Sequence, residues 1–289
     1  MNFIDFARIH GVEIDLSKFF ASDRIRRCGT VTKPRSGNGA YFWDGQRGWV
    51  MDWSGEAKVV WYNDPDAKPW SDQEKREWSL RRAQAATDQQ KRHEQAADIA
   101  ERALKNAEIK EHNYLHYKGF PEEKGFVLED RLLIPMRNVK TNRLQGYQAI
   151  SWNSAERKYD KKMLAGMMAK HAVLWLGPRP ASEIWFVEGY ATGLSVRNAL
   201  RSCGLGGAVV VCFSASNLVN IANQISNNRF VFADNDESGT GEKAAKETGL
   251  PWAMSDKVGE DANDLHKRAG LFALVAKLME CRSKVAIYC

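Results

Sequence analysis

The stretch Ile184-Trp-Phe-Val-Glu188-Gly189-Tyr190 is a short apolar run that ends abruptly in a carboxylate. A second stretch, Phe230-Val-Phe-Ala-Asp234-Asn235-Asp236, repeats the pattern. Runs of this kind are typical of buried parallel strands. Open α/β sheets place their active sites at the carboxyl ends of such strands. Because three carboxylates at one edge would repel each other, the pattern predicts a bound Mg²⁺ or Mn²⁺ and phosphate chemistry.

The residues around these two stretches alternate between helical and strand patterns. Such alternation requires right-handed crossovers and a mostly parallel sheet, so the predicted fold class is α/β. The predicted helices cover 191–203, 218–225, 238–246 and 271–279, and the strands after 184–188 cover 207–213, 229–233 and 250–254.

Carboxylates in this arrangement suit phosphoryl or nucleotidyl transfer. An Asp-x-Asp pair after a strand directs both side chains to one side of the edge, and Glu188 can complete the coordination or accept a proton. The N–H groups of Gly239 and Gly241, at a helix start, can cradle a phosphate. The alternative for Asp234 and Asp236 is an ordinary capped helix start.

Three motifs together resemble the Toprim domain of topoisomerases and DnaG-type primases: Glu188-Gly-Tyr-Ala-Thr, Asp234-Asn-Asp236 and Gly259-Glu-Asp261-Ala-Asn-Asp264-Leu265. The closer resemblance is to the Toprim primases of plasmids and phages. Five further segments match that group in the right order, over roughly residues 110 to 270. They are His112-Asn-Tyr-Leu-His-Tyr-Lys118-Gly119, Ile134-Pro-Met136, Gly146-Tyr-Gln-Ala-Ile150, Lys161-Lys-Met-Leu164 and Ser216-Asn-Leu218.

The resemblance implies a Toprim parallel sheet flanked by helices, with a smaller α+β subdomain before it. It also implies roles for particular residues. Glu188, Asp234 and Asp236 would be catalytic and would bind Mg²⁺ or Mn²⁺, with Asp261 and Asp264 supporting them. Lys161 and Lys162 would contact the template backbone or a nucleotide triphosphate. Two positions depart from the pattern, because Ser214 and Gly193 stand where relatives often carry Asp.

Composition is consistent with a nucleic-acid partner. The 289 residues carry 42 Lys+Arg against 36 Asp+Glu, a net charge of +6, and 44% are hydrophobic. This predicts a mildly basic, folded chain with room for about two domains. No apolar segment is long enough to cross a membrane and the N-terminus has no signal-peptide pattern, so we expect a cytoplasmic protein without a membrane partner. The five scattered cysteines support neither a disulfide framework nor a zinc ribbon.

Six of the ten tryptophans precede residue 80. The segments 40–43, 49–53 and 58–62, with turns at Asp44-Gly45 and Ser54-Gly55, predict a three-stranded meander. Aromatic side chains among cations suit single-stranded DNA, whose bases stack while its phosphates pair with Arg and Lys. The alternative is that the tryptophans form the core of a small sheet. The candidate DNA-binding residues are Arg24, Arg26, Arg27, Lys33, Arg35, Arg47, Trp43 and Trp49.

The stretch from Ser71 to Lys110 lacks Pro and Gly and is rich in Ala and balanced charge, which predicts a long, solvated linker helix. The predicted domains are therefore 1–70, a β-rich, zinc-free module; 71–110, the linker; 111–180, the α+β part of the core; and 181–289, the Toprim domain.

The resemblance implies a DNA primase of a phage or plasmid, a metal-dependent nucleotidyltransferase that makes short RNA primers on a single-stranded DNA template from ribonucleoside triphosphates. Gly239-Thr-Gly-Glu-Lys243 does not match a P-loop, so a helicase would be a separate partner. Two alternatives stay open. One is a Toprim nuclease, which would use the same metal edge. The other is a non-catalytic DNA-binding replication or interference protein, which Ser214 and Gly193 favour.

Overall fold

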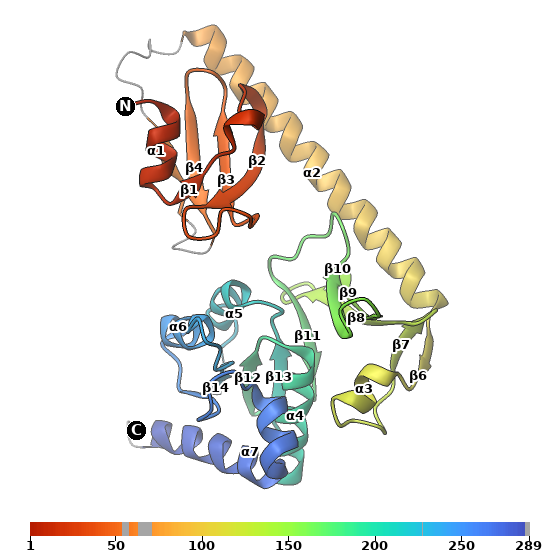
Figure 1. Cartoon of the computed structure of the whole chain (residues 1–289). Helices are drawn as coiled ribbons and strands as arrows, with labels where there is room; N and C mark the ends of the chain where they lie inside the picture. The colour runs from red at the N-terminus through yellow and green to blue at the C-terminus, as the bar shows by residue number, and fades with distance from the viewer. Residues whose placement is uncertain (54–57, 63–70, 227, 287–289) are drawn as a thin grey trace. The chain divides into compact units, whose positions relative to one another are not determined.

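Figure 1 shows a computed structural model of the chain, which describes residues 1–53, 58–62, 71–226 and 228–286. The chain divides into two compact units, Met1–Arg82 and Ala83–Cys289. The turn predicted at Ser54-Gly55 lies outside the described residues. No helix within the described ranges has the length and apolar character needed to span a bilayer.

The N-terminal unit is built on an antiparallel sheet in the order β1-β2-β3-β4-β5. The predicted meander is present as its last three strands, preceded by two strands and a helix that the sequence pattern did not indicate. Phe3 from that helix packs on one face of the sheet, together with Tyr41 and Val50. The elements are α1 (Phe3–Ile9), β1 (Val12–Glu13), the short 3-10 helix Leu16–Lys18, β2 (Ser22–Thr30), β3 (Gly39–Trp43), β4 (Gly48–Asp52) and β5 (Val60–Tyr62).

The predicted linker helix is present as α2 (Asp72–Asn106). Its first turns belong to the N-terminal unit, where the Trp78 ring lies 5.6 Å from that of Phe42. Further along, Ala96 and Ala100 are buried, and Ala100 packs with Leu133 and other residues of the second unit. Small side chains at four-residue spacing allow a helix to approach a sheet closely. The helix is therefore a packed element at both ends rather than a wholly solvated spacer.

The second unit contains one mixed sheet in the order β10-β9-β8-β11-β13-β12-β14-β15, extended by β7 and β6 beside β8. Strands β13, β12, β14 and β15 pair in parallel, whereas β11 pairs antiparallel with both β8 and β13. The strands are β6 (Glu108–Lys110), β7 (Gly125–Leu128), β8 (Arg131–Asn138), β9 (Leu144–Asn153), β10 (Lys158–Met163), β11 (Ala172–Leu176), β12 (Glu183–Val187), β13 (Ala208–Val211), β14 (Asn228–Phe232) and β15 (Trp252–Ala253).

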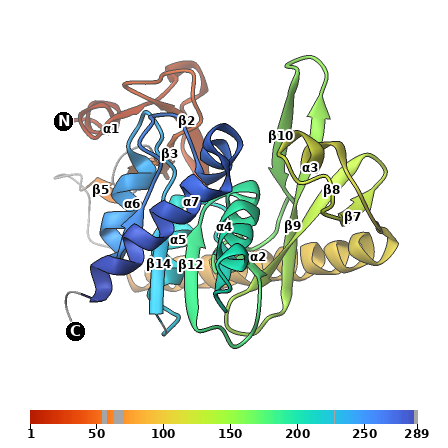
Figure 2. The ribbon, with the colours of Figure 1, turned by 90° about the horizontal axis from the view of Figure 1, so that it is seen from below.

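Helices cover both faces of the parallel strands because alternate strand residues point to opposite sides. Trp185 and Val187 pack with α4 and α7 on one face, and Ile184 and Phe186 pack with α5 and α6 on the other. Figure 2 shows α4 and α7 side by side. The helices are α3 (Asn113–Tyr117), α4 (Tyr190–Ser202), α5 (Ala215–Ala222), α6 (Thr240–Thr248) and α7 (Ala262–Ala286), with a break in α7 at Gly270.

The predicted strands and helices after residue 184 are thus present with shifted ends. The mixed character of the sheet differs from the mostly parallel sheet that the alternation predicts. Strand β11 adds an antiparallel neighbour to β13 and joins the parallel strands to the β8–β9 hairpin. The domains predicted at 111–180 and 181–289 therefore share one sheet and lie in a single compact unit.

Candidate active site at the edge of the sheet

Glu188 and Asp234 follow two neighbouring parallel strands. Strands β12 and β14 pair in parallel with Phe186 opposite Val231, which places both strand ends at one edge of the sheet. The backbone at Glu188 is held there, since its carbonyl oxygen accepts a hydrogen bond of 2.9 Å from the Phe213 N–H. The buried, β-branched and aromatic strands supply a rigid base for the two carboxylates.

The Asp234 carboxylate is held in an unfavourable environment. Burial, followed by repulsion from Asp261 and Glu188, raises its pKa to about 8, although the charge of Lys161 opposes this. Its Oδ1 atom is buried and has no hydrogen-bond partner among the residues that the structure describes. An ionised carboxylate buried without a partner carries a large desolvation cost, which a bound cation removes.

Glu188 shares this environment. Burial first, and then the negative charge of Asp236, raises the pKa of its carboxyl group, while the backbone N–H of Ala215 lowers it by hydrogen bonding. Two carboxyl groups with raised pKa values at one sheet edge are typical of a functional site rather than of a stabilising ion pair.

Asp236 has a different role, because it holds the start of α6. Its Oδ1 accepts hydrogen bonds from the Ser238 hydroxyl and the Thr240 N–H, and its Oδ2 accepts one of 2.9 Å from the Gly241 N–H. Burial alone would raise its pKa, but these hydrogen bonds together hold the pKa of Asp236 below its ordinary value. Asp236 is therefore an ionised helix cap, the alternative that the sequence left open.

The two glycines predicted to cradle a phosphate also serve this cap. The Gly241 N–H donates to the Asp236 carboxylate, and the Gly239 N–H donates to the Asp236 carbonyl oxygen at 3.0 Å. A phosphate at this helix start would have to displace Asp236. Gly241 has a second reason to be glycine, since a Cβ atom there would stand 2.2 Å from the Asp234 carbonyl oxygen.

Asp261 and Asp264 form the N-terminal cap of α7. The Asp261 Oδ1 accepts hydrogen bonds from the N–H groups of Asn263 at 2.7 Å and Asp264 at 2.9 Å. In return, the Asp264 Oδ2 accepts a longer bond of 3.4 Å from the Asp261 N–H, as in a capping box. The Asp261 Oδ2 accepts from the Thr192 hydroxyl on α4 at 3.1 Å. These bonds fix Asp261 where its charge acts on Asp234.

Two lysines bring positive charge to the same edge. The Lys161 ammonium lies 5.9 Å from the Tyr114 ring centre, and burial of this group, then repulsion by Lys118, lowers its pKa. The pKa of Lys161 is raised in turn by the negative charges of Asp261, Asp234 and Asp264, so its ammonium lies close enough to these carboxylates to interact with them. Lys162 alternates to the other face of β10, where it pairs with Asp160 at 3.2 Å. The structure thus brings Lys161, and not Lys162, to the acidic edge.

The carboxylate oxygens at this edge are ligands that suit a divalent cation, although they are not gathered into a closed site. No three His, Cys, Asp or Glu side chains in the described parts of the chain lie close enough together to hold a metal ion. The unpartnered Oδ1 of Asp234 and the raised pKa values of Asp234 and Glu188 fit a cation ligated by oxygen. These two residues are therefore the candidate ligands, with Asp236 next to them.

The two departures from the family pattern have local explanations. Ser214 caps α5, since its side chain accepts a hydrogen bond of 3.3 Å from the Asn217 N–H. Gly193 lies where α4 packs on the sheet, and a Cβ atom there would stand 2.6 Å from Val211. An acidic side chain at Gly193 would not fit without a shift of the helix.

The two tryptophans predicted to bind DNA lie on opposite faces of the N-terminal sheet. Trp43 stacks on Phe3 with 4.6 Å between ring centres, as part of the core. Trp49 lies on the other face, directly opposite Trp61 of β5, which is 53% exposed. The core interpretation therefore fits Trp43, whereas Trp49 and Trp61 lie on a face where an aromatic ring, that of Trp61, is exposed.

The predicted cations of this unit are dispersed. Arg27 is exposed on the face of Trp49 and lies over the ring of Trp53 at 5.2 Å. Arg26 lies on the face of Tyr41, over the ring of Phe20 at 3.7 Å. Arg24, Lys33 and Arg35 are exposed on β2 and the turn that follows it, and Arg47 is half-buried in the β3–β4 turn.

Sequence reasoning missed three residues that the structure places at these surfaces. Lys118 lies 3.9 Å from the Asp264 carboxylate, and its place in the Lys118-Gly119 motif was the available signal. Thr192 donates to Asp261 from α4. Trp61 was assigned to a strand but not to a surface, because the exposed face of a short strand cannot be known before its register.

No family model and no curated protein matches the chain. Among solved structures, the chain is similar to one described as the DnaG catalytic core, with 17% identity and a TM-score of 0.38 over 58% of each chain. It is also similar to one of bacteriophage T7 lagging-strand DNA polymerase interacting with primase domains of two gp4 subunits. There the identity is 16% and the TM-score 0.37, over 62% of this chain and 89% of the other.

Proposed function

We propose that this chain is a primase-like nucleotidyltransferase that copies single-stranded DNA into short RNA primers from ribonucleoside triphosphates. One observation supports this most directly. Asp234 is a half-buried carboxylate whose buried Oδ1 atom has no hydrogen-bond partner among the described residues. It lies at the same sheet edge as Glu188, and the charge of Lys161 acts on it. Phosphoryl transfer needs positioned cations around phosphate oxygens, and this edge offers ligands for a metal ion and an ammonium group.

The candidate roles follow from the geometry. Glu188 and Asp234 would hold Mg²⁺ or Mn²⁺, which when bound polarises phosphate oxygens and lowers the pKa of an attacking hydroxyl. Lys161 would bind a phosphate, because an anion next to its ammonium would offset the repulsion from Lys118. Asp236 and Asp261 would orient the edge through the helices they cap. In this proposal the motif order of the sequence supports the plasmid or phage type of primase.

The proposed template contact is the face of the N-terminal sheet that carries Arg27, Trp49 and Trp61. It presents the exposed ring of Trp61, the half-buried ring of Trp49 and, two strands away from Trp49, the exposed Arg27; aromatic rings and cations on one surface bind single-stranded nucleic acid without sequence preference. Replacing Trp61 with Ala should weaken binding of single-stranded DNA by about 1 kcal/mol or more, as measured by fluorescence anisotropy. Trp43→Ala is the matched comparison, which should lower stability instead because Trp43 belongs to the core.

The decisive experiment is a primer-synthesis assay with the full chain, single-stranded DNA, labelled ribonucleotides and Mg²⁺ or Mn²⁺. Short RNA products are expected, and Asp234→Asn should reduce them at least about 100-fold. Asp88→Asn, on the exposed surface of α2, is the matched control and should leave the yield unchanged. Products that persist in Asp234→Asn would contradict the proposed site.

Two other results would replace the proposal. Shortened DNA that depends on Asp234 would identify a nuclease using the same edge. DNA binding without any product would favour a non-catalytic replication or interference protein. The helix-capping roles of Asp236, Asp261 and Asp264 are the observation in favour of this last reading, because they explain three of the five acids without a metal.

A further inference from the structure

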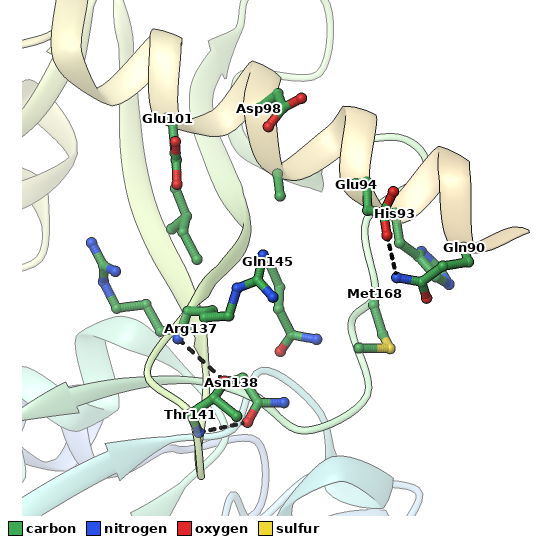
Figure 3. Close-up of a pocket in the computed structure, with 13 residues that line it drawn as sticks. Gln90, His93, Glu94, Asp98, Glu101, Arg137, Asn138, Thr141, Gln145 and Met168 are labelled. Atoms are coloured by element: carbon green, nitrogen blue, oxygen red, sulfur yellow. Dashed lines mark hydrogen bonds between the residues drawn. The ribbon is translucent and has the colours of Figure 1, made fainter.

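A cavity of about 580 Å³ lies on the second unit, between the second half of α2 and the turn that joins β8 to β9. Figure 3 shows Glu101 extending from α2 toward this hairpin, with Arg137 and Gln145 on the opposite wall. The His93 Nδ1 lies 2.9 Å from the Gly166 carbonyl oxygen, which holds the segment that leads to Met168 at one end. Cavities of this size bind small organic molecules.

Gln145 is the residue in this cavity that points to a ligand. Its side chain is only 7% exposed, and both the Oε1 and Nε2 atoms are buried without a hydrogen-bond partner among the described residues. A buried amide that makes neither of its hydrogen bonds is rare in folded proteins. Its last torsion is soft, so a small rotation can present an acceptor and a donor side by side to the cavity.

The charges of the two walls are separated rather than paired. Arg137 and Arg143 lie on the hairpin, and Glu94, Asp98 and Glu101 lie on α2. Within the described residues, neither arginine has an ion pair, and the Arg137 guanidinium donates only to the Asn142 carbonyl oxygen, at 3.2 Å. The guanidinium fork matches phosphate, while carboxylates accept hydrogen bonds from sugar hydroxyls.

We propose that this cavity binds a mononucleotide, with an adenine base preferred. The amide of Gln145 has the donor and acceptor that pair with adenine N7 and N6, and Ala97, Leu144 and Met168 give the ring an apolar surface. The phosphate goes to the arginine wall and the ribose to the carboxylate wall. None of these residues belongs to the sheet edge of Glu188 and Asp234, so this site is separate from the proposed active site and does not depend on it.

The test is calorimetric titration of the full chain with AMP in the presence of EDTA, which removes metal-dependent binding at the sheet edge. We expect AMP to bind, with UMP, adenosine and ribose 5-phosphate each weaker. Gln145→Leu should weaken AMP binding about tenfold or more, because it removes both amide groups at similar shape. Arg143→Ala, at an exposed position, should weaken binding of AMP but not of adenosine.

The controls are Gln84→Leu, the same substitution on the exposed part of α2 outside the cavity, and Asp234→Asn. Both should bind AMP as the original chain does. The proposal is overturned if AMP fails to bind at concentrations up to about 1 mM. It is also overturned if Gln145→Leu and Arg143→Ala bind AMP with unchanged affinity, or if Asp234→Asn abolishes AMP binding. A short oligoadenylate that binds more tightly than AMP and is weakened by Gln145→Leu would overturn it too.

Discussion

The acids that follow strands and the acids that begin helices differ in what surrounds them, although they meet at one edge. Glu188 and Asp234 follow strands, are half-buried, and have raised pKa values. Asp236 and Asp261 precede helices, and each carboxylate accepts two hydrogen bonds from backbone N–H groups. The Asp234 Oδ1 atom has no hydrogen-bond partner among the described residues, whereas the Asp236 and Asp261 carboxylates hold the starts of two helices. This contrast makes Glu188 and Asp234 the candidate functional pair, because the unpartnered Oδ1 atom of Asp234 and the raised pKa values of both carboxyl groups need another explanation.

The sharpest way to break this contrast is to compare Asp234→Asn with Asp236→Asn. The first should lower Mn²⁺ affinity at least about 100-fold without loss of stability, since an amide of the same shape removes a buried charge. The second should keep most of the affinity and lower stability by about 1 kcal/mol, because it weakens a charged cap. Calorimetry and urea unfolding measure the two quantities. Equal Mn²⁺ affinities in the two variants would show that the contrast is wrong.

Glu123 is the opposite case to Asp234, because its carboxylate is fully paired with an arginine. Glu123 accepts two hydrogen bonds from Arg197, at 3.1 and 2.6 Å, and Arg197 is only 8% exposed. Arg197→Met should lower the free energy of unfolding by about 2 kcal/mol, because it leaves a half-buried carboxylate unpaired. Arg201→Met, at an exposed neighbouring position, should change stability by less than about 0.5 kcal/mol. Urea unfolding of both variants at neutral pH tests this.

The cap of α7 should have a smaller effect. Asp261→Ala removes the acceptor for the Asn263 and Asp264 N–H groups and should cost about 1 kcal/mol in urea unfolding. Asp261→Asn, which can still cap, should recover most of this loss. Full stability in Asp261→Ala would mean that the residue is not structural, and its place among the candidate metal ligands would have to be restored.

The smallest expected effect is a pH dependence. The hydrogen bond from Arg197, and then its charge, lowers the pKa of Glu123 in the folded chain, although burial opposes this. Its contribution to stability is therefore fully present above the unfolded value of about 4.3 and is lost as the pH falls through the folded value. The stability difference between the original chain and Arg197→Met should narrow below about pH 4. A difference that stays constant at low pH would contradict the pairing.

The sequence predicted the strand ends of this site well because they are encoded locally. An apolar run that stops at Glu188 or Asp234 predicts both the strand and the point at which it ends. It could not distinguish candidate metal ligands from helix caps, because Asp suits a metal ion and a helix start equally. The capping role became visible only from the hydrogen bonds that Asp236 and Asp261 accept. It also missed β11, whose five residues carry no sign of their antiparallel pairing. The faces of Trp43 and Trp49 likewise depended on a register that the sequence leaves open.

Strand β11 has a consequence for the precision of the site. It is hydrogen-bonded on one side to β8 and on the other to β13, so the strand that carries Lys161 and the strands that precede Glu188 and Asp234 belong to one continuous sheet. A two-residue slip at β11 would keep the same faces inward and yet displace the hairpin by about 7 Å along the strands. The distance between the Lys161 ammonium and the carboxylates of Glu188 and Asp234 is therefore set by the backbone pairing of β11, which is remote from them. Substitutions in β11 should change this distance without changing the charge of any of the three groups.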